Sequence, residues 1–551
     1  MAAQIGQVSE VTGSNIKATM DAAQLTTAQS GDEKSSVTVG SMVEVKSGTA
    51  RVLGIVSAIR SPGMEKGAVM DISLVGQFID NGKGGADFRR GVARWPAIGS
   101  PVVTVADTDA ASVVKTTSTS TVHIGKAEFN GTQDIYLDVD NLLRTHFAIF
   151  GSSGSGKTST TSVILRAILQ RLPNAHMILL DPHNEYEGAF AGMTERLTLS
   201  TLRLPYWMLR FQELCAVFKV LPESEYASEV KILREAVVQA KTLYAGIAGG
   251  GVSAPVAAKP GQAPVQAPQS SLNLDSPVPF RLSDFRRIVN DMMGKLDNPE
   301  AIQSYLRILN RLEELTTDDR YGFMFGPQFV RDVMSEVICQ LTRIPVEGKP
   351  ITTIDLSDIP EEIVDVVVSV VFRTIFSFAV WSGEEGAVPT VLVCEEAHRY
   401  LWDDRTGKTI SLAVHAAGQV AKEGRKYGVG LGVISQRPSE VSPSIVSQCG
   451  TIITLRLGNE RDLAFVKNAL PDSAAGLMQA LPALNTREAI VFGQGVAFPT
   501  RLTVNELPAT ARPRQKVKSF MDAWSNDSTD TGLVNRTIER WRSRVHQIRR
   551  S

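Results

Sequence analysis

A short glycine-rich segment followed by lysine and threonine carries the clearest chemistry in this sequence. Residues 151–158 read Gly-Ser-Ser-Gly-Ser-Gly-Lys-Thr, which fits the pattern G-x-x-x-x-G-K-[ST]. Glycines let backbone N–H groups surround phosphate oxygens, and a following helix directs its positive end at them. Lys157 would add a charge at the β- and γ-phosphates, and the Thr158 hydroxyl would coordinate Mg²⁺. The predicted nucleotide-binding residues are Gly151, Ser152, Ser153, Gly154, Ser155, Gly156, Lys157, Thr158 and Ser159.

Two adjacent acids follow an apolar run later in the chain, in Val-Leu-Val-Cys-Glu-Glu at 391–396. A P-loop enzyme needs an acid at the end of a second apolar strand. We expect Glu395 to hold Mg²⁺ together with Thr158, and Glu396 to polarise the attacking water. The paired carboxylates favour an ATPase that turns over rather than a switch GTPase.

Gln436 follows a further apolar run, in Gly-Val-Ile-Ser-Gln-Arg at 432–437. A polar amide at such a strand end can contact the γ-phosphate or position the water. The alternative is a simple transition from strand to loop.

These polar groups must be positioned by the apolar runs that precede them. Near-continuous apolar strands that alternate with helices predict a parallel sheet covered on both faces. The P-loop lies between such a run and a helical pattern through Val163, Ile164, Ala167 and Ile168. The predicted strands are 146–150, 176–181, 351–356, 390–394, 429–435 and 451–455.

Composition divides the remaining chain into further segments. Short β-type runs predict a small barrel or sandwich, and helical spacing of apolar residues predicts an insertion within the α/β core. A stretch with almost no charge that is rich in Ala, Pro and Gly inside the insertion is typical of disorder. The C-terminal segment is basic and carries an apolar stripe from Val534 to Ile548. One interpretation is a basic helix that contacts nucleic acid or a neighbouring subunit. The alternative is a packing brace whose solvated face is basic. The predicted segments are a flexible arm at 1–35, a barrel at 36–125, the core at 126–203 and 326–510, the insertion at 204–325 with its loop at 249–279, and a helical brace at 511–551.

Overall composition excludes several classes of protein. The 551 residues are 43% hydrophobic and 21% charged, as in ordinary globular chains. A net charge of −1 excludes a polycation that coats nucleic acid, so any such contact needs a local patch or a ring of subunits. The four cysteines form no C-x-x-C pair, which argues against a zinc ribbon. The apolar stretch 363–381 contains Asp365 and Arg373, so we expect a buried helix and a cytoplasmic protein without membrane contact.

Four motifs in order resemble the HerA branch of the HerA–FtsK superfamily of RecA-like ATPases. They are the P-loop with its strand, Asp-Pro-His-Asn-Glu-Tyr at 181–186, Glu-Glu-Ala-His-Arg-Tyr-Leu at 395–401, and Lys-Glu-Gly-Arg-Lys-Tyr-Gly at 422–428 followed by Ser-Gln-Arg-Pro at 435–438. The resemblance covers about residues 36–510. It implies a RecA-like P-loop core with a HAS-barrel-like N-terminal barrel and a helical insertion.

The resemblance also implies a homohexamer that hydrolyses ATP with Mg²⁺ and moves double-stranded DNA through its central pore. A neighbouring subunit would supply an arginine finger, for which Arg425 is the first candidate and Arg437 and Arg456 are alternatives. The stretch 402–408, with Arg405 and Lys408, would face the lumen; the alternative is an ordinary solvated loop. We expect His183 and His398 to form hydrogen bonds near the nucleotide rather than a metal site.

Family members differ in their partners, so the resemblance leaves two functions open. One is a helicase or translocase that acts with a nuclease-like or sirtuin-type effector on the barrel face, in DNA end processing or antiphage defence. The alternative is an ATP-regulated hexameric platform that clusters and controls a toxic effector. A secretion or conjugation ATPase is a third, weaker interpretation.

Overall fold

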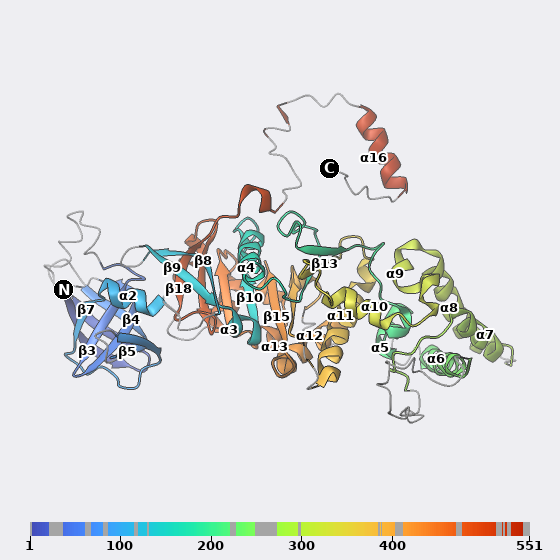
Figure 1. Ribbon diagram of the computed structural model, residues 1–551, viewed down its shortest axis with the longest axis horizontal. Helices are drawn as coiled ribbons and strands as arrows, with labels where there is room; N and C mark the ends of the chain where they lie inside the picture. Colours follow the sequence, from blue (N-terminus) through green and yellow to red (C-terminus); the bar gives the residue numbers. More distant parts are fainter. Residues whose placement is uncertain are drawn as a thin grey trace, which may run out of the picture.

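The computed structural model describes most of the chain, and its layout is elongated (Figure 1). A β-barrel lies at one end, a large sheet with its helices in the middle, and a group of helices at the other end. The described residues are 3–20, 37–60, 68–80, 86–114, 120–128, 132–220, 227–247, 273–295, 299–383, 386, 388–402, 411–469, 477–513, 521, 524–525 and 531–543. The predicted lumen loop from 403 to 408 lies outside them.

The N-terminal sheet of the described residues has seven strands, and six of them close into a barrel because β2 pairs with both β1 and β5. The seventh strand, β6, pairs with β5 beyond the closure. The strands are β1 (Gln4–Thr12), β2 (Asn15–Met20), β3 (Met42–Ser47), β4 (Ala50–Arg60), β5 (Ala68–Asp80), β6 (Ala86–Arg90) and β7 (Pro101–Thr104).

The barrel begins and ends earlier than its sequence predicts. The prediction of a flexible arm over 1–35 is wrong for residues 4–20, because Ile5 and Val8 point into the barrel core and a two-residue turn joins β1 to β2. Gly13 opens this turn with φ of 53°, which a glycine adopts without strain. The predicted boundary at 125 is also wrong, because β8 (Thr121–Glu128) pairs with the central sheet.

The central sheet contains eleven strands among the described residues, in the order β12-β13-β11-β14-β15-β10-β16-β17-β18-β8-β9. The first seven run parallel, and the last four add antiparallel pairs. All six predicted strands are confirmed within a residue of their ends. The bounds are β8 as above, β9 (Thr132–Asp138), β10 (Phe147–Phe150), β11 (Met177–Asp181), β12 (Thr194–Leu197), β13 (Ile351–Asp355), β14 (Thr390–Cys394), β15 (Val429–Ser435), β16 (Thr451–Leu455), β17 (Glu488–Gly493) and β18 (Thr500–Val504).

Helices cover both faces of this sheet, so its central strands are fully buried. The doubly covered parallel core confirms the predicted α/β class. The helices around the sheet and barrel are α2 (Asp107–Val114), α3 (Val139–Arg144), α4 (Lys157–Arg171), α10 (Met334–Thr342), α11 (Glu361–Ser382), α12 (Leu412–Glu423), α13 (Pro443–Val446) and α14 (Glu460–Asn468).

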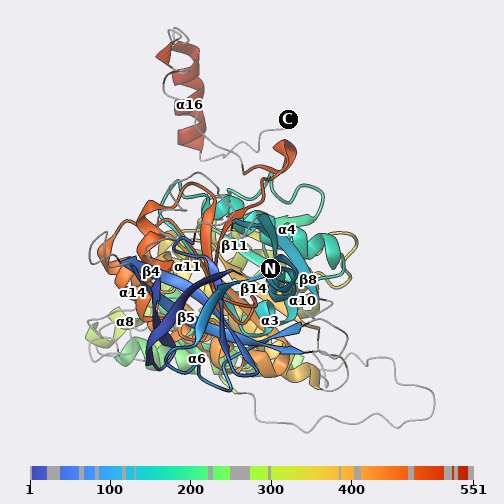
Figure 2. The ribbon, with the colours of Figure 1, turned by 90° about the vertical axis from the view of Figure 1, so that its left-hand side faces the viewer.

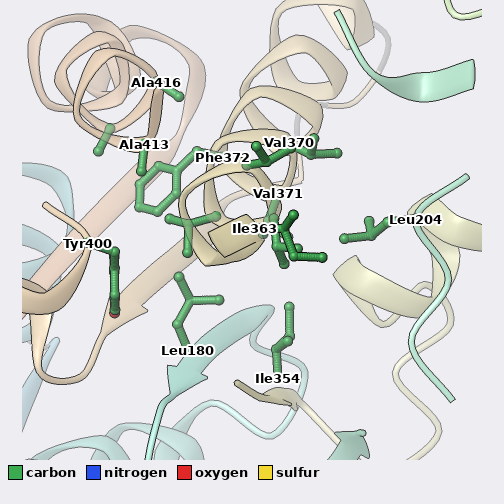
Figure 3. Packing of buried hydrophobic residues seen from close by; sticks show 14 of the residues in the cluster. Leu180, Leu204, Ile354, Ile363, Val370, Val371, Phe372, Tyr400, Ala413 and Ala416 are labelled. Atoms are coloured by element: carbon green, nitrogen blue, oxygen red, sulfur yellow. The ribbon is translucent and has the colours of Figure 1, made fainter. Parts of the chain in front are cut away.

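Helix α11 is the long apolar stretch that the sequence marks as a buried helix. It is long and apolar enough to span a membrane, yet 67% of its most apolar window is buried inside the protein. Figure 3 shows Val371 and Phe372 of this helix packed among side chains of α12 and of the sheet, such as Leu180. The prediction of a buried helix is confirmed, while the cellular location stays a prediction.

The segment between β12 and β13 contains the helices at the far end of the molecule (Figure 1). They are α5 (Phe211–Val217), α6 (Ala227–Ile247), α7 (Leu282–Met293), α8 (Pro299–Thr317) and α9 (Gly322–Phe325). Of the predicted disordered loop, 249–272 lies outside the described residues. Residues 273–279 are not disordered, because Lys241 Nζ donates to the carbonyls of Leu274 and Ser276 at 2.7 and 2.6 Å.

The C-terminal helix α16 (Thr531–Ser543) stands away from the body of the molecule in both views (Figures 1 and 2). Leu533 and Val534 are 50% and 57% exposed. The interpretation of this helix as a brace packed on its own chain is therefore wrong at these two residues, because no other described residue buries their apolar side chains. Of the rest of the predicted stripe, Ile538 is half-buried. The side chain of Trp541 and the residues Val545 and Ile548 lie outside the described part of the chain.

Candidate nucleotide site

The P-loop connects the end of β10 to the first residue of α4, as its sequence pattern requires. Gly154 and Gly156 have φ of 75° and 96°, in the left-handed region that favours glycine. At Gly156 space is also limited, because a Cβ would lie 3.2 Å from the backbone nitrogen of Arg487. The loop is fixed to the neighbouring strand ends, since the N–H groups of Gly151 and Ser152 donate to the carbonyls of Ser435 and Arg456.

Lys157 forms a buried ion pair with the acid pair that follows β14. Its Nζ lies 2.8 Å from Glu396 Oε1 and 3.8 Å from Glu395 Oε1. All three side chains are at most 10% exposed, so the lysine charge offsets the cost of burying carboxylates. The two motifs that the sequence separates by more than 200 residues are therefore in direct contact.

Glu395 is held by a hydrogen bond from Tyr186, whose hydroxyl donates to Oε2 at 2.5 Å. Burial raises the pKa of Glu395 to about 8, against the lowering effects of Lys157 and Tyr186. Its Oε1 atom is buried and accepts no hydrogen bond from the described residues. This oxygen is thus available to a further ligand.

Glu396 occupies a strained backbone position, with φ of 47°. Such a conformation is uncommon for residues other than glycine and is typical of functional turns. The turn directs the carboxylate at Lys157 on one side and at His398 on the other, where Nδ1 lies 3.2 Å from Glu396 Oε2. His398 Nδ1 is also 3.2 Å from the Ser435 hydroxyl, and burial lowers the pKa of its imidazole.

The motif at 181–186 forms a turn around a buried aspartate. Asp181 is fully buried and accepts the backbone N–H groups of His183 and Tyr186, both at 3.2 Å. Burial raises the pKa of this carboxyl group. The turn presents Glu185 to the P-loop, where Thr158 Oγ1 donates to Glu185 Oε2 at 2.9 Å.

The oxygen donors around Thr158 suit a hard divalent cation. Mg²⁺ prefers hydroxyl, carboxylate and phosphate oxygens and keeps several waters. Thr158 and Glu395 Oε1, which accepts no hydrogen bond from the described residues, are such donors, and Glu185 adds a third next to Thr158. The residues present therefore fit Mg²⁺. Glu185 is a site residue to which the sequence analysis gave no role, although its place after the second parallel strand was a usable signal.

Gln436 and two of the candidate arginines follow strands at the same edge as the P-loop. Gln436 is half-buried directly after β15, and Arg456 directly follows β16 with a half-buried side chain. Arg437 is exposed and pairs with Glu440 at 3.0 Å. Among the described residues, the Gln436 side chain forms no hydrogen bond with Lys157, Glu395 or Glu396.

Arg425 lies apart from this cluster. It is exposed in the turn before β15, at the edge of the sheet where the parallel strands begin. Burial lowers the pKa of His146, which precedes β10 at that edge, and the charge of Arg425 adds to this effect. The P-loop follows β10 at the other edge, so Arg425 does not reach the P-loop of its own chain. His183, by contrast, approaches the site edge, with Nε2 3.5 Å from Arg399 Nη1.

Arg487 is a further residue at the P-loop that the sequence analysis missed. It lies just before β17 with φ of 69°, and its N–H donates to the carbonyl of Ser155 at 3.0 Å. No motif marks it, because it belongs to the antiparallel part of the sheet, where strand pairing rather than a local pattern sets its place.

Residues 122–375 match the family model described as helicase HerA, central domain. The chain is 25% identical over 419 residues to the DNA double-strand break repair helicase HerA of Sulfolobus acidocaldarius, covering 75% of this chain and 74% of the relative. It is 24% identical over 413 residues to the protein of the same name from Pyrococcus furiosus, covering 70% and 69%.

Among solved structures, VirB4 of Thermoanaerobacter pseudethanolicus aligns with a TM-score of 0.49 and 16% identity, over 72% of this chain and 99% of the other. The bacterial conjugative coupling protein TrwB aligns with a TM-score of 0.46 and 12% identity, over 78% and 98%.

Proposed function

We propose that this chain, which is a HerA-type ATPase of the HerA–FtsK superfamily, moves double-stranded DNA at the expense of ATP. The observation that carries the proposal is the buried cluster of Lys157 with Glu395 and Glu396 at the P-loop. It combines a phosphate-binding loop with the acids that turnover requires. The choice of DNA as the substrate is supported by the relatives named DNA double-strand break repair helicase.

In the proposed reaction, Lys157 exchanges its ion-pair partner Glu396 for the phosphates of ATP. The N–H groups of the P-loop bind the phosphates, and Lys157 turns from Glu396 to the β- and γ-phosphates. Glu396 then holds a free carboxylate, which takes the proton of the attacking water. Thr158 and Glu395 would hold Mg²⁺, which supplies positive charge to the phosphate oxygens when it is bound. His398 keeps the Glu396 carboxylate in place from its other side.

A ring of six subunits, with Arg425 as the finger, completes the proposed site. Arg425 is exposed at the edge of the sheet away from its own P-loop, where it is free to meet a neighbour's nucleotide. A guanidinium is suited to a transferring phosphoryl group because it is always charged and binds oxygens in pairs. A ring also accounts for DNA binding by a nearly neutral chain, because Arg405 and Lys408, repeated in six copies around the ring, would together form a basic track for phosphates. An effector on the barrel face and a role in repair or defence are further parts of this proposal.

Turnover of ATP by the full chain, titrated with linear duplex DNA, tests the proposal. We expect a severalfold stimulation that disappears in the Glu396→Gln variant. If turnover is unchanged by DNA, the translocase proposal fails and the ATP-regulated platform becomes the better interpretation. A platform would keep its effector active in Glu396→Gln, whereas a motor would lose that activity with ATP turnover.

A further inference from the structure

His146 is a buried polar residue of the central sheet to which the proposed reaction gives no role. It directly precedes β10, and its side chain is buried, with 3% of the residue exposed. Its backbone lies in the left-handed region, with φ of 59°, which residues other than glycine rarely adopt. Such a conformation persists where surrounding contacts hold it, and it is frequent at functional positions.

Both ring nitrogens of His146 form hydrogen bonds with backbone groups of neighbouring elements. Nδ1 accepts the N–H of Leu431 in β15 at 3.0 Å, and Nε2 lies 3.1 Å from the carbonyl oxygen of Ala421 in α12. Because Nδ1 is an acceptor, the proton of the neutral imidazole is on Nε2, which donates to Ala421. Burial lowers the pKa of His146, in agreement with this neutral form.

These two hydrogen bonds lie on either side of the turn that carries Arg425. Ala421 belongs to the last turn of α12, Leu431 belongs to the first half of β15, and the turn Gly424–Tyr427 connects the two elements. The turn packs tightly, because a Cβ on Gly424 would lie 2.5 Å from a backbone oxygen. The imidazole therefore fixes both ends of the segment from which Arg425 projects.

The backbone of His146 belongs to the strand that leads to the P-loop. β10 follows it directly and pairs in parallel with β15 on one side and β16 on the other. The carbonyl of His146 accepts the N–H of Thr451 at the start of β16, at 3.3 Å. His146 thus connects the Arg425 turn, at one edge of the sheet, to the strand that enters the P-loop at the other edge.

We propose that His146 is a positioning residue for the arginine finger. Its imidazole holds the Arg425 turn in place relative to β10, so that the guanidinium meets the nucleotide of the neighbouring subunit. The inference rests on the proposed shared site, and it names the residue that sets the geometry of that site. A misplacement of about 1 Å by a residue far from the chemistry can lower a rate about a hundredfold.

Substitutions of His146 that keep or remove one hydrogen bond test this role. Asparagine tolerates the left-handed backbone and places an oxygen near the position of Nδ1, so His146→Asn keeps the bond to Leu431 and loses the bond to Ala421. We expect His146→Asn to bind Mg·ADP as wild type does in calorimetry, and to turn over ATP at least about tenfold more slowly without DNA. His146→Phe, which loses both bonds, should be slower still.

His176→Asn is the matched control. His176 directly precedes β11 at the same edge of the sheet, and its Nδ1 lies 2.7 Å from the carbonyl oxygen of Thr342. Its hydrogen bond holds α10 rather than the Arg425 turn. Turnover and ADP affinity of His176→Asn should therefore equal those of wild type.

Mixtures of variants show which half of the shared site His146 serves. His146→Asn mixed with Lys157→Ala should regain turnover, because some sites then combine an intact P-loop with a well-placed finger. His146→Asn mixed with Arg425→Ala should regain none, because both variants lack that finger. A merely structural loss of stability would not produce this pattern.

Three results would overturn the role of His146: wild-type turnover in His146→Asn, a loss of its ADP affinity, or recovery of its turnover by Arg425→Ala. The last two would place its effect at the P-loop of its own chain. Wild-type turnover in Arg425→Ala would instead refute the proposed finger, so the two failures are distinguishable. Because DNA is absent, a failure of the translocase proposal leaves these results unaffected.

Discussion

At the scale of single residues, Lys157 is shared between two roles. In the structure it neutralises Glu395 and Glu396, and in the proposed reaction it turns to phosphate. The same ammonium therefore keeps the acid pair buried and frees Glu396 when the nucleotide arrives. Glu395, with its raised pKa, and Glu396, with its strained backbone, differ in environment although they are adjacent.

Glu396→Gln should bind ATP with an affinity close to that of wild type and hydrolyse it about 10²–10⁴ times more slowly, because an amide accepts no proton from water. Single-turnover hydrolysis with calorimetric ATP binding measures both. Glu336→Gln, an exposed acid on α10, is the matched control and should leave both unchanged. A Glu396→Gln variant that turns over normally would assign the base to another residue.

The raised pKa of Glu395 predicts a pH dependence of stability. Between its ordinary value of 4.5 and about 8, the unfolded chain loses this proton while the folded chain keeps it. The free energy of unfolding should therefore fall as the pH rises through this window. Calorimetric melting at pH 5 and pH 8, without nucleotide, should show a decrease for wild type that is smaller by several degrees in Glu395→Gln. Parallel curves for the two proteins would show that Glu395 is ionised throughout.

At the scale of elements, the part of the fold that could be predicted from the sequence is the parallel part of the central sheet. Strands such as β10 and β15 are buried on both faces, so their sequences are continuous apolar runs that end in polar motifs. β1, β17 and β18 lack this signal, because their pairing depends on partners far along the chain. That is why the P-loop, Glu395 and Glu396 are found from the sequence, while Arg487 is not.

The helical insertion is fixed to the core by a buried charge network. Arg373 of α11 donates to both carboxylate oxygens of Glu213 on α5, at 3.1 and 2.9 Å, and Ser369 donates to the same group. Glu213 is 2% exposed.

Arg373→Met should lower stability by about 3–5 kcal/mol, because it leaves that carboxylate buried without its cation. Thermal melting of the full chain measures the loss, and Arg286→Met serves as the control because its pair with Glu313 is exposed. Equal melting temperatures for the two variants would show that the network adds no net stability.

At the scale of the whole molecule, the position of Arg425 predicts that the active site is shared between subunits. Arg425→Ala should keep nucleotide affinity and lose most turnover, whereas Lys157→Ala should lose both. A mixture of the two inactive variants should regain part of the activity, since some sites then combine an intact P-loop with an intact finger. Steady-state turnover as a function of mixing ratio measures this, and a mixture as inactive as its components would place the finger elsewhere.

ATP-dependent displacement of a triplex-forming oligonucleotide from linear duplex DNA tests the translocase proposal most directly. Wild type should strip the third strand in the presence of ATP and Mg²⁺, and Glu396→Gln and Lys157→Ala should leave it bound. If wild type hydrolyses ATP and binds the duplex but leaves the triplex intact, the chain is not a DNA translocase.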